Sequence, residues 1–263
     1  MKENYLIAIL TDFGLKDGFV GTMKGVILGI NPSVKIVDIS HDIAPQNIME
    51  ASYVLKSSSP YFPAGTIFLV VIDPGVGSDR KAIIVKTSRF LYLGPDNGVL
   101  SGIYNQAEDE VIEITSKTYF LPDISSTFHG RDIFAPVAAY LSTGISPYLM
   151  GEKIDNIKTI NNINPFINDK NAVCGTIIYT DRFGNLITNL REDFFHNFGI
   201  DFKNINIKDR IINGLSNSYS EKSPGELLAI KGSSGYIEIA VNQGNAGKLL
   251  QAGTGDTVVV NGE

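Results

Sequence analysis

The chain has 263 residues, a formal net charge of −6 and no clustered run of basic residues. A protein that binds the nucleic-acid backbone needs clustered Lys and Arg side chains, so this charge excludes nucleic acid as an expected partner and favours a small molecule. No apolar run reaches the roughly 18 residues of a membrane span, so no membrane partner is expected. The single cysteine, Cys174, cannot form an internal disulfide and stands in an apolar run, which predicts a buried core residue. We therefore expect a soluble cytoplasmic protein with one or two domains.

The first part of the chain alternates between buried apolar runs and segments with helical spacing. These segments predict strands at 5–10, 35–39 and 68–72 and helices at 19–30 and 45–58. Such an alternation is typical of a mostly parallel sheet covered by helices, that is, an α/β domain. Further on, the pattern predicts a hairpin-like pair of strands at 82–86 and 90–93, a strand at 111–114 and a helix at 133–141.

The pattern of apolar runs and turns changes after an asparagine-rich segment, Asn156–Asn171. We place a linker at 161–171, between an α/β domain at 1–160 and a second domain at 172–263. The second domain carries short β-rich runs separated by Gly, Asn and Ser turns, which favours a small antiparallel β-barrel. Its predicted strands are at 173–180, 185–189, 227–230, 236–240 and 257–260.

Charged side chains stand where strands of the first domain end. The stretch Phe68–Arg80, FLVVIDPGVGSDR, is a buried strand that ends at Asp73, followed by a glycine loop and Arg80. Asp12 ends the first strand, and His129 lies in the loop before the helix at 133–141. Open α/β sheets bind ligands beyond the carboxyl ends of their strands, so these side chains form a candidate site.

Each of these residues also has a simpler interpretation. Asp12 suits a helix cap, and a lone histidine such as His129 is more often a hydrogen-bonded core residue. A Mg²⁺ or Mn²⁺ site is a further alternative, because oxygen and imidazole ligands are available, although no pair has a diagnostic spacing. The candidate ligands for that alternative are Asp12, Asp73, Asp96, His129 and Asp132.

Two polar, glycine-containing loops stand out in the second domain, Tyr179–Asn185 and Gly232–Tyr236. In the first, Phe183 lies close to the amide of Asn185, and an aromatic ring beside an amide is a common way to hold a flat heterocycle. Plain turns, with Phe183 as a core residue, are the alternative interpretation.

Six motifs then occur in one order along the chain. They are TDFG-x-x-D (Thr11–Asp17), IDPGVGS-x-R (Ile72–Arg80), GPDNG (Gly94–Gly98), TFHGRDIFAP (Thr127–Pro136), D-x-FGN-x-x-TN (Asp181–Asn189) and GY-x-E-x-A-x-N-x-G (Gly235–Gly244). With them the chain resembles, from about Ile7 to Gly244, the S-adenosyl-L-methionine (SAM) hydrolases that form adenosine. This family is also called the SAM hydroxide adenosyltransferases and is related to fluorinases and chlorinases.

The resemblance implies an N-terminal α/β domain, a C-terminal β-barrel and a homotrimer with active sites between subunits. It also implies the reaction of SAM with water to give adenosine and L-methionine, with no metal and no cofactor, SAM being the substrate. An Asp–Arg–His set holds the attacking water in this family, and it falls on Asp73, Arg80 and His129. The proton of that water is accepted by either Asp73 or His129, a choice that the resemblance leaves open.

The resemblance likewise implies substrate contacts. The aspartate that binds the ribose falls on Asp12, and the residues on the adenine side fall on Phe183 and Asn185. The methionine end falls on Asp181 for the ammonium and on Ser233 for the carboxylate. Two further positions inside the shared motifs are predicted to bind substrate, Phe128 and Glu238.

The chain departs from the halide-using relatives at two positions. They have an arginine where Ser234 stands here and a tyrosine where Asp73 stands, so the resemblance favours a hydrolase. Two other functions stay open at this point: a non-catalytic sensor that binds SAM or a nucleoside, and a metal-dependent nucleotide phosphohydrolase.

Overall fold

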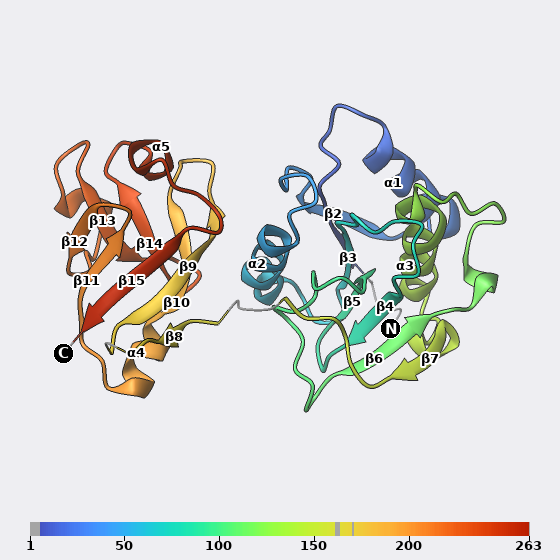
Figure 1. Ribbon diagram of the computed structural model, residues 1–263. Coiled ribbons are helices and arrows are strands. Elements are labelled where there is room, and N and C mark those ends of the chain that lie inside the picture. Colours follow the sequence, from blue (N-terminus) through green and yellow to red (C-terminus); the bar gives the residue numbers. More distant parts are fainter. Residues whose placement is uncertain (1–5, 161–163, 170, 263) are drawn as a thin grey trace. The chain divides into compact units, whose positions relative to one another are not determined.

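The computed structural model of this protein describes residues 6–160, 164–169 and 171–262. The chain divides into two compact units, Met1–Ile160 and Asn161–Glu263 (Figure 1). The linker predicted at 161–171 falls partly outside the described residues. Within its described part, strand β8 (Phe166–Ile167) pairs with β9 (Val173–Thr180) of the second unit. Among the described residues, no helix is long and apolar enough to cross a membrane.

The N-terminal unit contains one mixed sheet. Its strands are β1 (Leu6–Thr11), β2 (Lys35–Ser40), β3 (Ile67–Val71), β4 (Ala82–Lys86), β5 (Leu91–Pro95), β6 (Glu110–Ile114) and β7 (Gly151–Ile154). They lie in the order β2-β1-β3-β5-β4-β6-β7, parallel from β2 to β5 and antiparallel from β5 to β7. The predicted α/β class is confirmed, and the antiparallel pairing of β4 with β5 confirms the hairpin-like pair.

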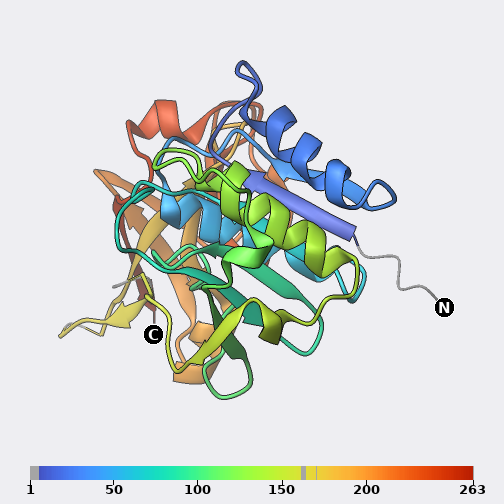
Figure 2. The same cartoon turned by 90° about the vertical axis from the view of Figure 1, so that its right-hand side faces the viewer.

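Helices cover both faces of this sheet. They are α1 (Phe19–Ile30), α2 (Ile48–Ser58) and α3 (Ala135–Ser142). On β1, the fully buried Ile7 and Ile9 pack in the same apolar layer as α1 and α3, and Ala8 and Leu10 pack in the layer of α2. Figure 2 shows α1 and α3 side by side on one face of the sheet. A strand covered on both faces is apolar at nearly every position, which explains the apolar run of β1 from Leu6 to Leu10.

The carboxyl ends of β1 and β3 determine where the polar side chains gather. The two strands are parallel neighbours, and Thr11 lies opposite Val71 in their register. The acidic residues that follow these strands, Asp12 and Asp73, therefore stand at the same edge of the sheet, as the sequence predicts.

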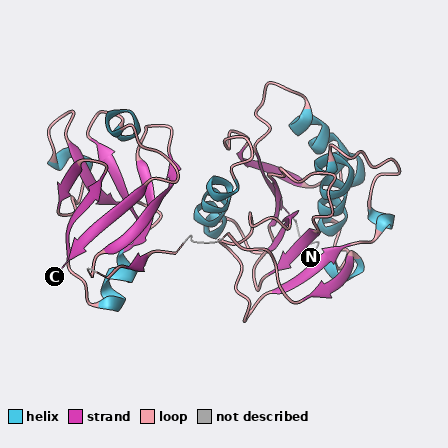
Figure 3. Cartoon of the chain, viewed as in Figure 1, coloured by secondary structure: helices cyan, strands magenta, loops and turns pink. Residues whose placement is uncertain are grey.

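The C-terminal unit is an antiparallel, nearly closed sheet, which confirms the predicted barrel (Figure 3). Besides β8 and β9 its strands are β10 (Leu186–Arg191), β11 (Phe202–Ile207), β12 (Arg210–Asn213), β13 (Leu227–Lys231), β14 (Tyr236–Val241) and β15 (Thr257–Gly262). The order is β12-β11-β15-β9-β10-β14-β13, and a backbone bridge from Ser216 to Ile230 brings the segment after β12 beside β13. Side chains such as Ile177, Ile205 and Ile237 fill the interior.

Three strands of this unit are missing from the sequence-based prediction: β8, which lies in the predicted linker, and β11 and β12. The sequences of β11 and β12, FKNINI and RIIN, are rich in asparagine and basic residues, which are depleted in strands. Only alternate residues, Ile205 and Ile207 on β11 and Ile212 on β12, reach the core. The pattern is therefore that of strands with one solvated face. Two short helices, α4 (Glu192–Phe198) and α5 (Ala246–Leu250), complete the unit.

Candidate active site

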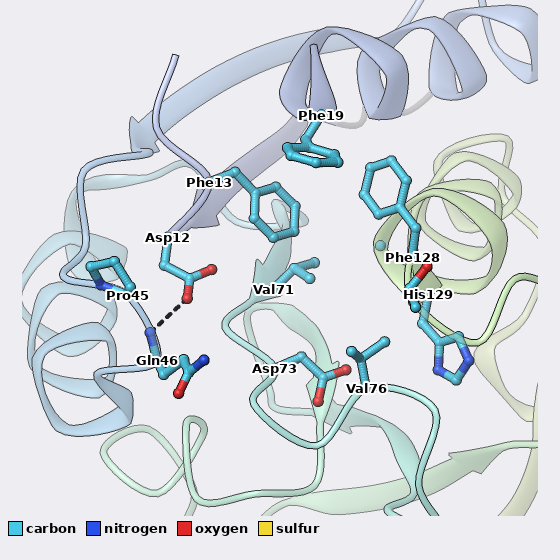
Figure 4. Close-up of a pocket in the computed structure, with 12 residues that line it drawn as sticks. Asp12, Phe13, Phe19, Pro45, Gln46, Val71, Asp73, Val76, Phe128 and His129 are labelled. Carbon is cyan, nitrogen blue, oxygen red and sulfur yellow. Dashed lines mark hydrogen bonds between the residues drawn. The ribbon is translucent and has the colours of Figure 1, made fainter. Parts of the chain in front are cut away.

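Asp12 is fixed at the end of β1 by a backbone contact from the loop before α2. One oxygen of its carboxylate, Oδ2, accepts a hydrogen bond from the backbone N–H of Gln46 at 2.8 Å (Figure 4). Gln46 has φ of 65°, in the left-handed region that a non-glycine residue enters at a cost. The strained backbone thus orients the carboxylate, and nothing in the sequence of this loop indicates it.

Asp73, Arg80 and His129 form one hydrogen-bonded chain. Nε of Arg80 lies 3.1 and 3.0 Å from the two carboxylate oxygens of Asp73, and Nη2 lies 2.5 Å from Oδ2. The same Nη2 lies 2.6 Å from Nδ1 of His129. The side chains of Arg80 and Asp73 are only 7% and 5% exposed, and the guanidinium lies 5.4 Å from the centre of the Phe134 ring. The structure therefore brings together the three residues that the sequence predicts as catalytic.

The glycine loop between Asp73 and Arg80 explains how a short segment returns to its own beginning. Oγ of Ser78 donates to the carbonyl of Gly75 at 2.7 Å, and the backbone N–H of Arg80 donates to Oγ of Ser78 at 3.3 Å. Gly77 has φ of 78°, and a Cβ there would lie 2.3 Å from the carbonyl oxygen of Ser126. The loop needs a glycine at this position for both reasons.

The contact with Arg80 determines the protonation of His129. A guanidinium only donates hydrogen bonds, so Nδ1 of His129 must be the acceptor, and in the neutral ring the proton then sits on Nε2. Burial lowers the pKa of the His129 imidazole below its usual value of 6.5, and the charge of Arg80 lowers it further. Asp73 and Asp132 act in the opposite direction on the same pKa. The ring is therefore neutral at pH 7 and presents a donor at Nε2.

Asp132 organises the loop that carries His129. Its side chain is completely buried and accepts hydrogen bonds from the backbone N–H of Ser125 at 2.8 Å and from Nε of Arg131 at 2.6 Å. His129 comes directly before one turn of π-helix, Gly130–Phe134, that continues into α3. Such turns are frequent at functional sites.

A pocket of about 300 Å³ opens at this edge of the sheet (Figure 4). Its polar wall contains Asp12, Asp73 and His129, whereas Arg80 is not among the lining residues and joins Asp73 to His129 from behind. The apolar wall is an aromatic cluster whose ring centres are 5.2–5.9 Å apart, made of Phe13, Phe19 and Phe128. The predicted substrate-binding residues Asp12 and Phe128 thus share one pocket with two of the predicted catalytic residues.

A second pocket, of about 800 Å³, lies in the C-terminal unit. It is lined by all five residues that the sequence predicts to bind substrate in this unit: Asp181, Phe183, Asn185, Ser233 and Glu238. Tyr219 and Gln243 line it as well, and the sequence-based prediction contains neither. Tyr219 stands in a polar loop, SNSYSEK, that offers no pattern by which it could be recognised.

The carboxylate of Asp181 holds its own loop in shape. Oδ1 accepts hydrogen bonds from the backbone N–H groups of Phe183 at 2.9 Å and Asn185 at 2.8 Å, and Oδ2 accepts one from Nδ2 of Asn185 at 2.9 Å. Gly184 has φ of 87°, and a Cβ there would lie 2.0 Å from the side chain of Asn245. In this loop Phe183 stays 74% exposed, which leaves its ring available for a ligand and contradicts the core-residue alternative.

Glu238 is the most buried acid of the second pocket. It is 9% exposed, and its Oε2 accepts a hydrogen bond from the Tyr219 hydroxyl at 3.1 Å. Burial raises the pKa of the Glu238 carboxyl; the hydrogen bond from Tyr219 partly offsets this, and the charge of Asp181 adds to it. Burial together with the charge of Glu238 also raises the pKa of Tyr219 to about 12.

The side chains that the sequence offers as candidate Mg²⁺ or Mn²⁺ ligands have different roles in the fold. Asp96 is buried and accepts a hydrogen bond from the backbone N–H of Lys158 at 2.7 Å, and it does not line the pocket. Asp132 holds the loop before α3, as described above. Within the ranges that the structure describes, no group of three or more His, Cys, Asp or Glu side chains is arranged to hold a metal ion.

Comparison with known proteins identifies relatives that match most of the chain. An (R)-S-adenosyl-L-methionine hydrolase of Methanocaldococcus jannaschii is 38% identical over 95% of this chain and 94% of its own length. A fluorinase of Actinoplanes sp. is 24% identical over 76% of each chain. The crystal structure of an uncharacterized conserved protein from Thermotoga maritima matches with a TM-score of 0.89 and 38% identity, over 97% of this chain and 100% of that one.

Family models match both units. The model of the SAM hydroxide adenosyltransferase N-terminal domain matches residues 7–151, and that of the C-terminal domain matches residues 175–259. The chain therefore belongs to the SAM hydroxide adenosyltransferase family.

Proposed function

We propose that this protein is an enzyme that hydrolyses SAM to adenosine and L-methionine. The observation that carries the proposal is the hydrogen-bonded chain Asp73–Arg80–His129 at the wall of a pocket, in a member of this family. A protein that only binds SAM has no need of an arginine clamped between an acid and a histidine. The name of the relative from M. jannaschii specifies the R form of the sulfonium, and we extend the proposal to that form.

In the proposed reaction a water oxygen attacks C5′ of the ribose in line with the sulfonium. The O–C5′ bond forms while the C5′–S bond breaks, and the electron pair leaves with sulfur, which becomes the neutral thioether of methionine. No general acid is required, because the leaving group needs no proton. The enzyme has to orient the water and accept its proton, so that the oxygen gains hydroxide character as it donates its electron pair to C5′.

The residues of the first pocket divide these tasks. Arg80 supplies a fixed positive charge, and His129 presents its Nε2–H as a donor to the water oxygen. Because Nδ1 of His129 is occupied by Arg80, we assign the role of proton acceptor to Asp73. This assignment chooses between the two acceptors that the sequence leaves open. Side chains alone activate the water in this mechanism, without metal or cofactor.

The substrate contacts follow from the same proposal. In the first pocket Asp12 holds the ribose hydroxyls, and Phe128 contributes to the apolar wall. In the second pocket Phe183 and Asn185 hold the adenine. Asp181 and Ser233 bind the methionine end, and Glu238 is a further substrate-binding residue of this pocket.

Assembly is the remaining part of the proposal. Each pocket carries only part of the predicted set, so we propose a homotrimer in which different subunits supply the two parts of each active site. A cytoplasmic location suits a chain whose single cysteine needs no oxidising compartment.

One chromatography experiment tests the reaction. Purified protein is incubated with the R and S forms of SAM in the presence of EDTA, and we expect adenosine and methionine in equal amounts, formed faster from the R form. A sensor returns SAM unchanged. If EDTA abolishes turnover and Mg²⁺ or Mn²⁺ restores it, the metal-free mechanism is wrong.

A further inference from the structure

Glu238 occupies a position where folding does not call for a carboxyl group. It lies in the middle of β14, opposite Ile187 of β10 and Ile230 of β13. Its neighbours on the strand, Ile237 and Ile239, point into the barrel core, so Glu238 is on the other face, beside a small apolar cluster. Burying a carboxyl among apolar groups costs free energy, and one hydrogen bond from a hydroxyl offsets only part of that cost, so its presence needs an explanation other than stability.

Two neighbours hold this carboxyl in place. The Tyr219 hydroxyl donates to Oε2 at 3.1 Å. On the other side the carboxyl lies against Gly232, where an added Cβ would be only 1.7 Å from Oε1. The adjacent Lys231 forms its ion pair with Glu192. Within the described part of the chain, the groups that shift the pKa of Glu238 include no cation, so the carboxyl keeps hydrogen-bonding capacity for a ligand.

The surroundings indicate which kind of ligand group fits. The pocket around Glu238 contains the exposed ring of Phe183 and the apolar side chains of Ile230 and Val241. A flat uncharged ring that carries an N–H donor suits such a place, since burying an ammonium ion in the same place costs far more desolvation energy. The partly exposed Asp181 and the exposed Ser233 are better placed to bind the ammonium and the carboxylate of methionine.

We propose that Glu238, positioned by Tyr219, accepts a hydrogen bond from the exocyclic amine of adenine and makes the second pocket selective for aminopurines. The inference rests on the proposed function, because it takes the adenosyl group as the ligand. Glu238 is then a residue that determines substrate specificity, and Tyr219 is a positioning residue that acts through it.

The test compares two nucleosides that differ only in this amine. Calorimetry measures the Kd of adenosine and of purine riboside, which lacks the amine, for the full-length protein and its variants. A hydrogen bond to a buried charged group changes affinity by about tenfold to a hundredfold. We expect the wild-type protein to prefer adenosine by at least about tenfold, and Glu238→Ala to lose most of that preference. Tyr219→Phe, which removes only the hydroxyl, should lose part of it.

Two further variants separate a specific effect of Glu238 on nucleoside affinity from misfolding and from a change in net charge. Glu238→Gln keeps the shape of the side chain and serves if Glu238→Ala does not fold; its weaker acceptor should also reduce the preference. Asp209→Asn removes one negative charge from an exposed turn of the same unit and should leave the preference unchanged.

Two results would overturn the inference. One is an adenosine preference that is the same in the wild type and in the Glu238 variants. The other is a loss of L-methionine binding in these variants with the nucleoside preference intact, which would assign Glu238 to the ammonium end. Failure of the proposed function looks different, because the wild-type protein would then leave SAM intact whatever its nucleoside preference.

Discussion

Replacing Arg80 tests how the water is activated. Its guanidinium makes three contacts with the carboxylate of Asp73, at 3.1, 3.0 and 2.5 Å, and one with Nδ1 of His129, at 2.6 Å. Arg80→Ala removes all four contacts and the cation that pairs with a carboxylate that is 5% exposed. The loss of one preorganised electrostatic contact at a reacting group lowers kcat by about 10²–10³-fold, and we expect a fall of at least this size.

The structure also predicts what should change little. Arg80 does not line the pocket, so the affinity for SAM should fall much less than the rate. Breaking a buried ion pair destabilises a fold by about 3–5 kcal/mol, so thermal unfolding of the variant is measured first. Arg80→Lys is the matched variant, since it keeps the positive charge but cannot bridge Asp73 and His129 with a planar fork. Its rate should lie between those of the wild type and Arg80→Ala.

The assay combines calorimetric SAM affinity with single-turnover rates at saturating SAM. If folded Arg80→Ala loses binding while its bound complex reacts at the normal rate, Arg80 does not act on the nucleophile. If Arg80→Lys reacts as fast as the wild type, positive charge alone suffices and the hydrogen-bond geometry is irrelevant to the rate.

Three further outcomes are expected. The pKa of the His129 imidazole is lowered, so the ring stays neutral at and above about pH 6.5. Activity that depends on the neutral ring should be lost only as the pH falls through this lowered pKa. A loss of kcat on the acid side that already sets in at or above pH 6.5 would contradict this. Asp12→Ala removes a contact to the bound ribose, so calorimetry should show affinity falling at least as far as the single-turnover rate, and the opposite order would reassign Asp12. Mixing Asp73→Ala with Asp181→Ala subunits at equal amounts should restore activity at about a quarter of the sites of re-associated trimers, whereas no recovery would count against sites shared between subunits.

The acidic edge of the first pocket is readable from the sequence because its cause is local. Two unbroken apolar runs end at Asp12 and Asp73, and strands buried on both faces belong to the middle of a parallel sheet, where such ends meet. The turn that returns Arg80 to Asp73 is also local, since seven residues and a glycine at φ 78° suffice to form it. The barrel strands with continuous apolar runs are predicted for the same reason, and β11 and β12 are missed because their short sequences, FKNINI and RIIN, are rich in asparagine.

Contacts between distant segments decide the rest. The proton position of His129 follows from an arginine 49 residues away, and the orientation of Asp12 follows from the backbone of Gln46, 34 residues away. Tyr219 becomes part of the second pocket because its loop folds over β14, where its hydroxyl meets Glu238. A sequence records which side chains are present and their local periodicity. Hydrogen-bond partners across the fold depend on the packing of whole elements, so only the tertiary structure determines them.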